Sequence, residues 1–417
     1  MDKPPLKILL SAYSCGPGRG SEPGVGWNAT LAMAALCEIH VLTTFEFKDD
    51  INRLQAEGKL PPSIHFHFFD IPLGKMVWKH PTGFWVRLHY VLWQRAASRQ
   101  VKVLHSREHF DSAQHLTFVR YWGRSCLADA GIPYILGPVG GAEYVPKSLL
   151  EGFSAKGRLF EGIRNIVRGI SERMPSVRRT IRNARVVLAT TELSALRIKR
   201  IRGTDGDVLL CGESALTNRE RTELDVGRTE HDGIVFCGLG RLVPLKRYDL
   251  AVKAFAKADI PGSRLRLIGG GPEEMRLRFL ADSLGVGSRV QITGFVPRVE
   301  ALHELAFCDV LLHPSTHDSG GWACIEGMAA GLPVVCLDWG GPGAQVTEAT
   351  GFRIQVADED SVVAGMADAM RCLGDAEMRT RMSRACKEAV RNTFNWAAKA
   401  KIYWELHKRI EEGRTNE

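Results

Sequence analysis

The 417 residues are 45% hydrophobic and carry a net charge of +8, which is typical of a folded protein and, by length, of two domains. The basic balance favours anionic partners such as nucleotides, phosphates, nucleic acid or acidic lipid, although it also serves solubility alone. No run of eighteen apolar residues occurs, so a membrane-spanning helix is excluded, and the N-terminal apolar run is too short for a signal peptide.

The ten cysteines are scattered over both halves of the chain, and no two of them form a CxxC pair. This pattern predicts reduced, buried thiols in a cytoplasmic protein. It argues against a disulfide framework and against a zinc site built from cysteines.

The first half of the chain alternates between strand and helix patterns. A strand at residues 7–13 precedes a glycine-rich loop, and a helix at 29–37 and a second strand at 39–44 follow. This order predicts a doubly wound α/β domain, which we place at residues 1–211. Further strands are expected at residues 64–70, 111–116, 134–137, 185–190 and 208–211.

A second series of strand and helix patterns predicts another parallel α/β domain at residues 234–395. The segment 212–233 is polar, charged and without periodicity, so we assign it as the linker. Residues 396–417 contain an amphipathic C-terminal helix. Within the second domain, strands are expected at 234–242, 263–271, 289–295, 310–316 and 332–338, and helices at 247–258, 273–285, 299–309 and 322–330.

Two segments combine basic and apolar residues and break this alternation. Residues 75–103 interleave aromatic residues with Lys and Arg, and residues 156–185 carry nine Lys and Arg residues against Glu161 and Glu172. A basic helix with interleaved apolar residues can lie on an anionic membrane. An ordinary amphipathic helix with its apolar face in the core has the same composition, so both interpretations stay open.

The glycine-rich loop after the first strand matches a dinucleotide-binding fingerprint only loosely. Gly24 to Ala29 fit G-x-G-x-x-A and Glu46 follows, but the first strand ends near Tyr13, well before Gly24. A hydride-transfer enzyme is therefore disfavoured. The loop does offer backbone N–H groups at a helix N-terminus, where an anion can bind.

Two cations follow the first strand of the second domain. Arg241 and Lys246 lie in the turn before the next helix, where they can neutralise a diphosphate at the carboxyl edge of a parallel sheet. Lys and Arg also commonly cap turns. The next strand ends at Gly269, Gly270 and Gly271, which either let a flat base or sugar approach the backbone or make a tight turn.

The stretch PSTHDSGGWACIEGMAAGLPVV places two carboxylates around a glycine turn. Asp318 lies in the loop and Ser319 is a candidate N-cap, whereas Glu326 lies one turn inside helix 322–330, which stops at Gly331. The two acids therefore share no helix face and are not a metal pair. The turn suits a phosphate or sugar hydroxyls, and Glu326 can accept hydrogen bonds from a ribose diol. The alternative is a solvated Asp and a surface Glu.

The segments GRL…K, GGGPE, ITGF and PSTHDSGGWACIEGMAAGLPVV closely resemble the family-4 glycosyltransferases, a large retaining group with the GT-B fold. GRGSEPGVGW, AQHLTFVRYW and GIPYILGPVGG are similar to a bacterial branch of that family that serves polysaccharide biosynthesis. The resemblance covers nearly the whole chain. The E-x7-E signature of the family is Asp318-x7-Glu326 here, so the first acid is one methylene shorter, which points to a different sugar.

The resemblance implies two doubly wound Rossmann-like domains facing a central cleft, with the C-terminal helix crossing back to the N-terminal domain. The first domain would bind the acceptor. The second would bind a nucleotide sugar, UDP- or GDP-linked, as a substrate, and no cofactor is expected.

The resemblance also assigns roles to residues. Arg241 and Lys246 would hold the donor diphosphate, and Asp318 would hold the donor sugar. His115 follows a predicted strand, where many relatives carry a histidine that contacts the donor sugar or acceptor. These four are the candidate catalytic residues. The candidate donor-binding residues are Glu326, Ser319, Gly320, Gly321, Trp322, Gly270 and Gly271; the candidate acceptor and phosphate loop contains Gly20, Ser21, Glu22, Gly24 and Glu143; no metal site is predicted.

We therefore expect a retaining, metal-independent glycosyltransferase, hexosyltransferase-like, that moves a sugar from a nucleotide-diphosphate sugar to a glycan or lipid-linked acceptor in cell-surface polysaccharide synthesis. A double displacement needs two carboxylates about 5 Å apart, and the sequence nominates no such pair, which favours front-face attack. We expect a cytoplasmic protein with peripheral contact to the inner face of the cell membrane through residues 75–103 and 156–185, and no nucleic-acid partner. The alternatives are an epimerase or phosphorylase of the same fold and a non-catalytic nucleotide-sugar-binding module.

Overall fold

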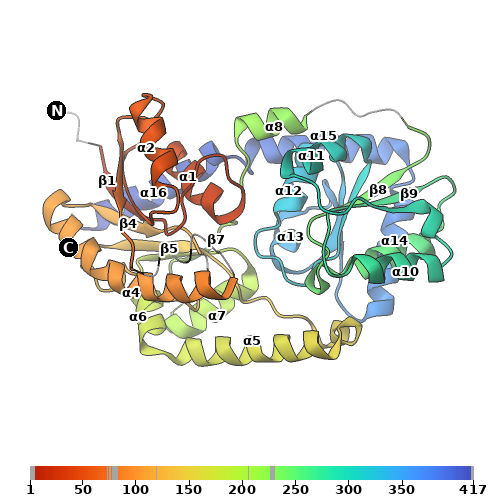
Figure 1. The fold of residues 1–417 in the computed structure, drawn as a ribbon, viewed down its shortest axis with the longest axis horizontal. Coiled ribbons are helices and arrows are strands. Elements are labelled where there is room, and N and C mark those ends of the chain that lie inside the picture. Colours follow the sequence, from red (N-terminus) through yellow and green to blue (C-terminus); the bar gives the residue numbers. More distant parts are fainter. Residues whose placement is uncertain are drawn as a thin grey trace. The chain divides into compact units, whose positions relative to one another are not determined.

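The computed structural model describes residues 5–72, 74, 77, 83–118, 120–204, 206–225 and 231–414. The chain forms two compact units, shown in Figure 1. Unit 1 contains Met1–Ala142, Ile166–Glu213 and Trp396–Glu417, and unit 2 contains Glu143–Asn165 and Ser214–Asn395.

These units differ from the expected boundaries in two places. Residues 143–165 belong to unit 2, although the sequence placed them in the N-terminal domain. The expected linker 212–233 contributes a helix, α8 (Asn218–Leu224), to unit 2, and residues 226–230 of it lie outside the described part. The helix begins with a capping box, because Thr217 and Glu220 hydrogen-bond each other's backbone N–H groups.

Unit 1 is built on a seven-stranded parallel sheet with the order β3-β2-β1-β4-β5-β6-β7. Each expected strand of this half is present, and the apolar residues of the central strands fill the core. The strands are β1 (Lys7–Ser11), β2 (Glu38–Thr43), β3 (Ile64–Phe68), β4 (Ser112–His115), β5 (Tyr134–Val139), β6 (Val186–Ala189) and β7 (Val208–Leu210). The helices of unit 1 are α1 (Ser21–Met33), α2 (Lys48–Ala56), α4 (Gly83–Glu108), α6 (Pro175–Asn183), α7 (Glu192–Arg202) and α16 (Trp396–Arg414), and α5 (Ala155–Arg173) continues from unit 2 into unit 1.

Helix α1 begins at Ser21, eight residues earlier than the expected start at residue 29. Its glycines serve close packing of the helix. A Cβ on Gly24 would lie 2.2 Å from the carbonyl oxygen of Arg19, and one on Gly26 would lie 2.3 Å from that of Ser14. The glycines therefore let the helix approach the chain that precedes it, and Gly24 lies in the helix and not in a phosphate loop.

The C-terminal helix α16 packs within unit 1, as the resemblance implied. His407 is fully buried, and its two ring nitrogens lie 2.8 Å from Ser112 Oγ and 3.1 Å from Gln114 Oε1 of strand β4. This polar contact fixes the last helix against the centre of the sheet.

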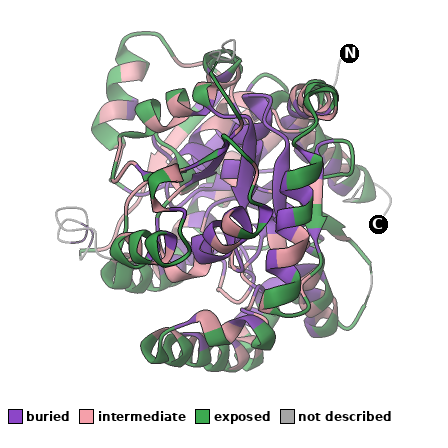
Figure 2. Ribbon diagram, turned by 90° about the vertical axis from the view of Figure 1, so that its right-hand side faces the viewer, coloured by how far each residue is buried: buried purple, intermediate pink, exposed green. Residues whose placement is uncertain are grey.

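Unit 2 has a six-stranded parallel sheet with the order β10-β9-β8-β11-β12-β13. Figure 2 shows buried central strands with exposed residues on the outer faces of the helices. The strands are β8 (Val235–Leu239), β9 (Arg264–Ile268), β10 (Val290–Ile292), β11 (Val310–His313), β12 (Val334–Leu337) and β13 (Gly351–Ile354). The helices include α9 (Tyr248–Ala258), α10 (Glu274–Ser283), α11 (Arg298–His303), α12 (Trp322–Ala329), α13 (Gly340–Gln345), α14 (Glu359–Cys372) and α15 (Ala376–Asn392).

The strand order of unit 2 reverses between β8 and β11, because β9 follows β8 on one side and β11 lies on the other. In open parallel sheets, ligands bind at such a switch point, outside the carboxyl ends of the strands. The loops after β8 and β11 carry residues 240–247 and 314–321, so the fold brings together the two stretches that the sequence singled out.

Two further expectations concern cysteines and membranes. The ten cysteines are free, and all except Cys372 are buried, as expected. In the described part of the chain, no helix is both long and apolar enough to cross a membrane.

Candidate donor site

Asp318 is the centre of a charged cluster at the switch point. Its Oδ2 lies 2.5 Å from Lys246 Nζ and 3.0 Å from His313 Nε2, and its Oδ1 accepts a hydrogen bond from the backbone N–H of Gly321 at 2.9 Å. Burial alone would raise the pKa of Asp318, but Lys246 and His313 outweigh it and hold the pKa well below its usual range. Asp318 is therefore an ionised anchor that fixes Lys246 at the edge of the sheet.

The sequence did not single out His313. It is buried at the end of β11, and burial followed by the charge of Lys246 lowers its pKa. The neutral ring can donate its Nε2–H to Asp318. A histidine at a strand end, directly before the motif, was the available signal.

Two side chains hydrogen-bond to the backbone of the turn Ser319–Trp322. Gln345 Nε2 donates to the Gly320 carbonyl at 2.6 Å, and Ser214 Oγ donates to the same oxygen at 2.5 Å. The N-cap of α12 is Gly321 in the left-handed region with φ 58°, and it has no side-chain cap, so the expected N-cap role of Ser319 is wrong. Asp318 satisfies an N–H of the turn instead, because its carboxylate reaches the Gly321 amide.

In the described part of the chain, the amides of Ser319 and Gly320 have no hydrogen-bond partner. They lie at the positive end of α12, where an anion is stabilised by the helix dipole and by unpaired N–H groups. The turn can therefore receive a phosphate or a sugar hydroxyl.

Glu326 lies inside α12 and is buried, so it is not the surface Glu of the alternative interpretation. Arg298 of α11 pairs with it, with Nη1 2.5 Å from Oε1. Burial raises the pKa of Glu326, and Arg298 only partly opposes that shift. The pKa values of Asp318 and Glu326 are thus shifted in opposite directions, which fits two separate tasks.

Arg241 and Lys246 follow β8 on one short loop. The Arg241 side chain is exposed and makes no hydrogen bond or ion pair with the described residues. Ser315 Oγ, Thr316 Oγ1 and the Thr316 amide all donate to the carbonyl of Leu245, at 3.3, 3.2 and 3.0 Å. These bonds join the loop after β8 to the loop after β11.

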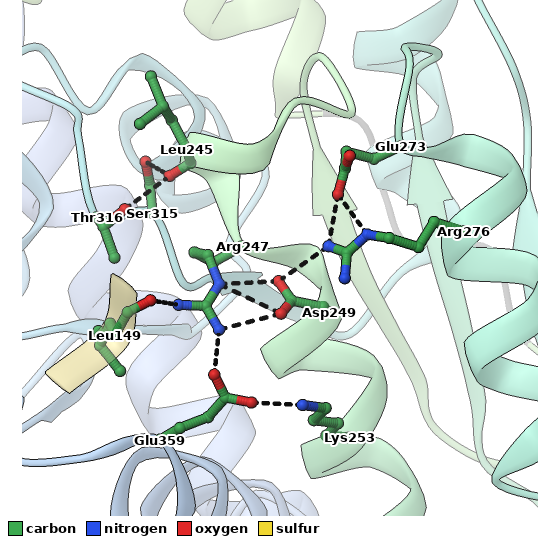
Figure 3. Close-up of polar contacts among 10 residues, drawn as sticks. All are labelled: Leu149, Leu245, Arg247, Asp249, Lys253, Glu273, Arg276, Ser315, Thr316 and Glu359. Atoms are coloured by element: carbon green, nitrogen blue, oxygen red, sulfur yellow. Dashed lines mark hydrogen bonds and ion pairs between the residues drawn. The ribbon is translucent and has the colours of Figure 1, made fainter. Parts of the chain in front are cut away.

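Arg247, which the sequence did not single out, anchors this loop from inside (Figure 3). The side chain is 1% exposed and its guanidinium donates to Asp249, to the Leu149 carbonyl at 2.9 Å and to Glu359 at 2.6 Å. Glu359 also pairs with Lys253. Arg247 thereby ties the short 3₁₀ helix Lys147–Gly152 to α9 and α14, and it fixes the backbone that presents Lys246.

Gly270 and Gly271 pack against neighbouring backbone. A Cβ on Gly270 would lie 2.7 Å from the Phe295 amide nitrogen, and one on Gly271 would lie 2.3 Å from the Leu242 carbonyl oxygen. The Leu242 N–H donates to the Gly270 carbonyl at 3.0 Å. The glycines therefore hold the loops after β8 and β9 close together, which is the tight-turn interpretation.

Glu143 belongs to unit 2 and not to a loop of the N-terminal domain. It is buried, and a Cβ on Gly340 would lie 3.6 Å from Glu143 Cγ and 2.5 Å from the Asp318 carbonyl oxygen. The neighbouring Tyr144 ring stacks edge-on against Trp339 with 5.1 Å between centroids. Glu143 is thus a further carboxyl group beside the Asp318 turn.

The other predicted residues lie in unit 1. Gly20 is the N-cap of α1, Ser21 and Glu22 form its first turn, and Glu22 Oε2 accepts from the Phe118 amide at 2.7 Å. His115 is 2% exposed at the end of β4.

Both ring nitrogens of His115 are engaged, with Nδ1 3.1 Å from Ser125 Oγ and Nε2 3.3 Å from Tyr90 Oη. Burial lowers its pKa to about 4. His115 is therefore a neutral core histidine in this state, and contact with a ligand needs one of these bonds to open.

Two parallel-sheet Rossmann-like units, a cation loop after one strand of unit 2 and an acid–glycine turn after another are the architecture of the GT-B fold. Residues 220–389 match the family model described as glycosyl transferases group 1, and the matched segment lies within unit 2. This match supports the resemblance to the family-4 glycosyltransferases.

Curated relatives match part of this chain. The chain is 31% identical over 184 residues to the lipopolysaccharide core biosynthesis glycosyltransferase LpsD of Rhizobium meliloti, covering 44% of this chain and 51% of LpsD. It is 34% identical over 208 residues to the D-inositol 3-phosphate glycosyltransferase of Corynebacterium glutamicum, covering 48% of each. The chain spans about half the length of the curated relatives it matches.

Solved structures match along nearly the whole chain. The crystal structure of WaaG, a glycosyltransferase involved in lipopolysaccharide biosynthesis, has a TM-score of 0.55 at 15% identity and covers 95% of this chain and 99% of its own. Anabaena HepE in complex with UDP-glucose has a TM-score of 0.55 at 17% identity, covering 99% and 100%. At these identities the likeness establishes the fold.

Proposed function

We propose that this protein is a glycosyltransferase that moves a sugar from a nucleotide-diphosphate sugar to a glycan or lipid-linked acceptor in cell-surface polysaccharide synthesis. The observation that carries the proposal is the Lys246–Asp318 pair beside the open amides of α12, at the switch point of a group 1 glycosyltransferase domain. The names of the relatives support it, since they include lipopolysaccharide and inositol-phosphate glycosyltransferases.

In this proposal, the donor lies across the carboxyl ends of β8 and β11. Arg241, Lys246 and the N-terminus of α12 hold the diphosphate, and Glu326 accepts hydrogen bonds from the ribose. Asp318 orients Lys246 and, with the turn amides, faces the sugar. Preorganised groups of this kind typically contribute about 3–4 kcal/mol each to the stabilisation of developing charge, here on the departing diphosphate.

Retention of configuration at the anomeric carbon is also part of the proposal. A double displacement needs a carboxylate free to attack the sugar. Asp318 is held by Lys246, His313 and the Gly321 amide, and Glu326 is paired with Arg298. These bonds favour front-face attack, in which the leaving phosphate helps to deprotonate the acceptor hydroxyl as the sugar–phosphate bond breaks.

We further propose that the transfer needs no metal, because the two cations Arg241 and Lys246 can neutralise the diphosphate themselves. Chelation by EDTA is expected to leave the initial rate of transfer unchanged. A rate that falls with EDTA and returns with Mg²⁺ or Mn²⁺ would reject this part.

On the acceptor side, we propose that Glu22 and His115 of unit 1 and Glu143 of unit 2 act on the acceptor or position its surroundings. Glu22 Oε2 accepts a hydrogen bond from the Phe118 amide at 2.7 Å, and Phe118 lies in the segment that follows β4. A loss of acceptor affinity in Glu22→Gln, with donor hydrolysis unchanged, would be the signature of this role.

Membrane contact is a second part of the proposal, and α4 supports it. Its buried Tyr90 and Trp93 are core residues, so the segment 75–103 is partly an ordinary amphipathic helix. Residues 75, 76 and 78–82 of that segment lie outside the described part. The remaining face exposes Phe84, Trp85, Leu88, Val91 and Leu92 beside Arg87, Arg95, Arg99 and Lys102.

Helix α5, in the segment 156–185, exposes a second apolar stripe formed by Leu159, Phe160, Ile163, Ile166, Val167 and Ile170. Apolar side chains rimmed by cations suit an anionic bilayer surface. Sedimentation with vesicles should require anionic lipid, and Leu88→Asp with Val91→Asp should weaken it. Equal binding to neutral vesicles would contradict this assignment.

The donor assignment is tested with a panel of nucleotide sugars, by following release of the free nucleoside diphosphate. At least one donor should be turned over, and Glu326→Ala and Lys246→Ala should each lower that turnover. Unchanged turnover in both variants would show that these roles are wrong.

A further inference from the structure

One face of the sheet edge in unit 1 carries three histidines and an acid that the proposed function does not use. In the parallel register, His40 of β2 pairs with His65 of β3, and Leu42 pairs with His67. Because alternate residues of a strand share a face, this register gathers the three histidines with Glu38, two residues before His40. The alternation E-x-H on one strand and H-x-H on the next was visible in the sequence, but the pairing of the strands was not.

Three of these side chains converge on a small volume. His40 Nε2 lies 3.1 Å from Glu38 Oε1, and His65 Nε2 lies 3.6 Å from the same oxygen. All three ligand atoms lie within 4.8 Å of one another. Two ligands bound tetrahedrally to Zn²⁺ at about 2.0–2.1 Å are separated by about 3.3 Å, so the side chains already have the spacing of a coordination shell.

His67 fixes the orientation of His40. The Nδ1 atom of His40 lies 2.8 Å from His67 Nε2, and the two rings are stacked. Histidines that bind a metal usually hydrogen-bond through their other ring nitrogen, which sets the tautomer and the ring direction. His67 thereby leaves Nε2 of His40 directed to Glu38 and His65.

The cluster is open to solvent on one side. The His65 side chain is 47% exposed and that of Glu38 is 30% exposed, so a metal ion and a water molecule can reach them. Lys7 Nζ lies 3.5 Å from Glu38 Oε1 and is the competing cation. It also lies 3.6 Å from Glu108 Oε2, so it retains an anionic partner when Glu38 binds a metal.

We propose that Glu38, His40 and His65 form a Zn²⁺ site, with water in the fourth position and His67 as the positioning residue. Among the described strands, β3 lies at the edge of the sheet and pairs with β2, so a metal bound by both strands would hold the sheet edge together. The site belongs to unit 1, whereas the candidate donor site belongs to unit 2, and zinc binding is independent of the proposed transfer.

The test is calorimetric titration of the untagged full chain with ZnCl₂, together with the visible absorption of a Co²⁺ complex as a readout of tetrahedral geometry. The wild-type chain should bind one equivalent. His65→Ala removes an exposed ligand without disturbing the core and should weaken binding more than about 100-fold, beyond the effect of losing an outer-shell partner. Glu38→Gln should weaken binding in the same direction.

His67→Ala separates positioning from ligation, because it should weaken binding by about 10–100-fold while one equivalent still binds. His303→Ala and Cys372→Ser change an exposed histidine and an exposed thiol of unit 2 and should bind like the wild type. Absence of equimolar binding by the wild-type chain, or wild-type affinity in His65→Ala, would overturn the proposal.

Discussion

Lys246 Nζ lies 2.5 Å from Asp318 Oδ2, and so a cation after one strand is held by an anion after the neighbouring strand of the same sheet. His313 shares that oxygen at 3.0 Å. The pair fixes the position of Lys246, and in the proposed function this lowers the reorganisation needed when the donor diphosphate develops charge. The loop after β11, through Asp318, therefore helps to position Lys246, which lies in the loop after β8.

Loss of this cation should lower turnover. We predict that Lys246→Met lowers the turnover of nucleotide sugar about 100- to 1,000-fold, the usual effect of removing one preorganised charge-stabilising group. Lys253→Met is the matched control, since Lys253 pairs with Glu359 in the same unit. The measurement is the initial rate of nucleoside diphosphate release. A rate for Lys246→Met within about threefold of the wild-type rate would contradict the proposed role of Lys246.

The depressed pKa of Asp318 predicts a pH dependence of stability. Its folded pKa lies below the unfolded value of about 3.9, so its contribution is present above that value and is lost as the pH falls. Thermal unfolding between pH 7 and pH 3 should therefore show a steeper loss for the wild type below about pH 5 than for Asp318→Asn. Parallel curves would show that the carboxylate does not contribute in this way.

Glu326 is predicted to read the ribose. Glu326→Gln should weaken binding of the preferred nucleoside diphosphate by about 10- to 100-fold, the range of one or two hydrogen bonds to a charged group. The wild type should bind the 2′-deoxy nucleotide more weakly than the ribonucleotide. Glu326→Gln should bind the two nucleotides with equal affinity, because the contact to the 2′-hydroxyl is already lost. Calorimetry measures both affinities for each protein. If the losses from Glu326→Gln and from removal of the 2′-hydroxyl were additive, Glu326 would not contact the ribose.

Arg247 and Arg241 lie in one loop, but substitution of Arg247 should lower stability, whereas substitution of Arg241 should lower turnover. Arg247→Ala leaves buried Asp249 without its main partner and should lower the free energy of unfolding by about 3–5 kcal/mol. Arg241→Ala removes an exposed side chain and should change stability by less than about 0.5 kcal/mol while lowering turnover. Denaturant unfolding and donor turnover separate the two, and equal losses of stability would refute the distinction.

Most strands and the two carboxylates of the site could be predicted from sequence because each depends on local pattern. Apolar runs after turns predicted the seven strands of the first sheet and five of the six strands of the second, and the acid–glycine turn before a small-residue helix indicated Asp318 and Glu326. The short strand β13, Gly351–Ile354, was not predicted. The start of α1 could not be predicted, since glycines inside a helix disfavour it unless close packing requires them, as the 2.3 Å approach at Gly26 shows.

The partners of the site residues depend on tertiary packing and were missed for that reason. Arg298 and Arg247 pair with Glu326 and Glu359, which lie 28 or more positions away in the sequence, so no local pattern indicates these pairs. His313 lies five residues before Asp318, and its position at a strand end was the only local signal. The assignment of residues 143–165 to unit 2 has the same origin, because Arg247 reaches the Leu149 carbonyl across 98 positions of sequence. The histidine cluster likewise appears only once β2 and β3 are paired.

The most direct test of the glycosyltransferase assignment is product analysis by NMR and mass spectrometry after incubation with the preferred nucleotide sugar and an acceptor glycan. We predict equal amounts of free nucleoside diphosphate and glycosylated acceptor, with the anomeric configuration of the donor kept and both products reduced in Glu326→Ala. Recovery of the donor as an isomer, or its return unchanged despite tight binding, would contradict glycosyl transfer.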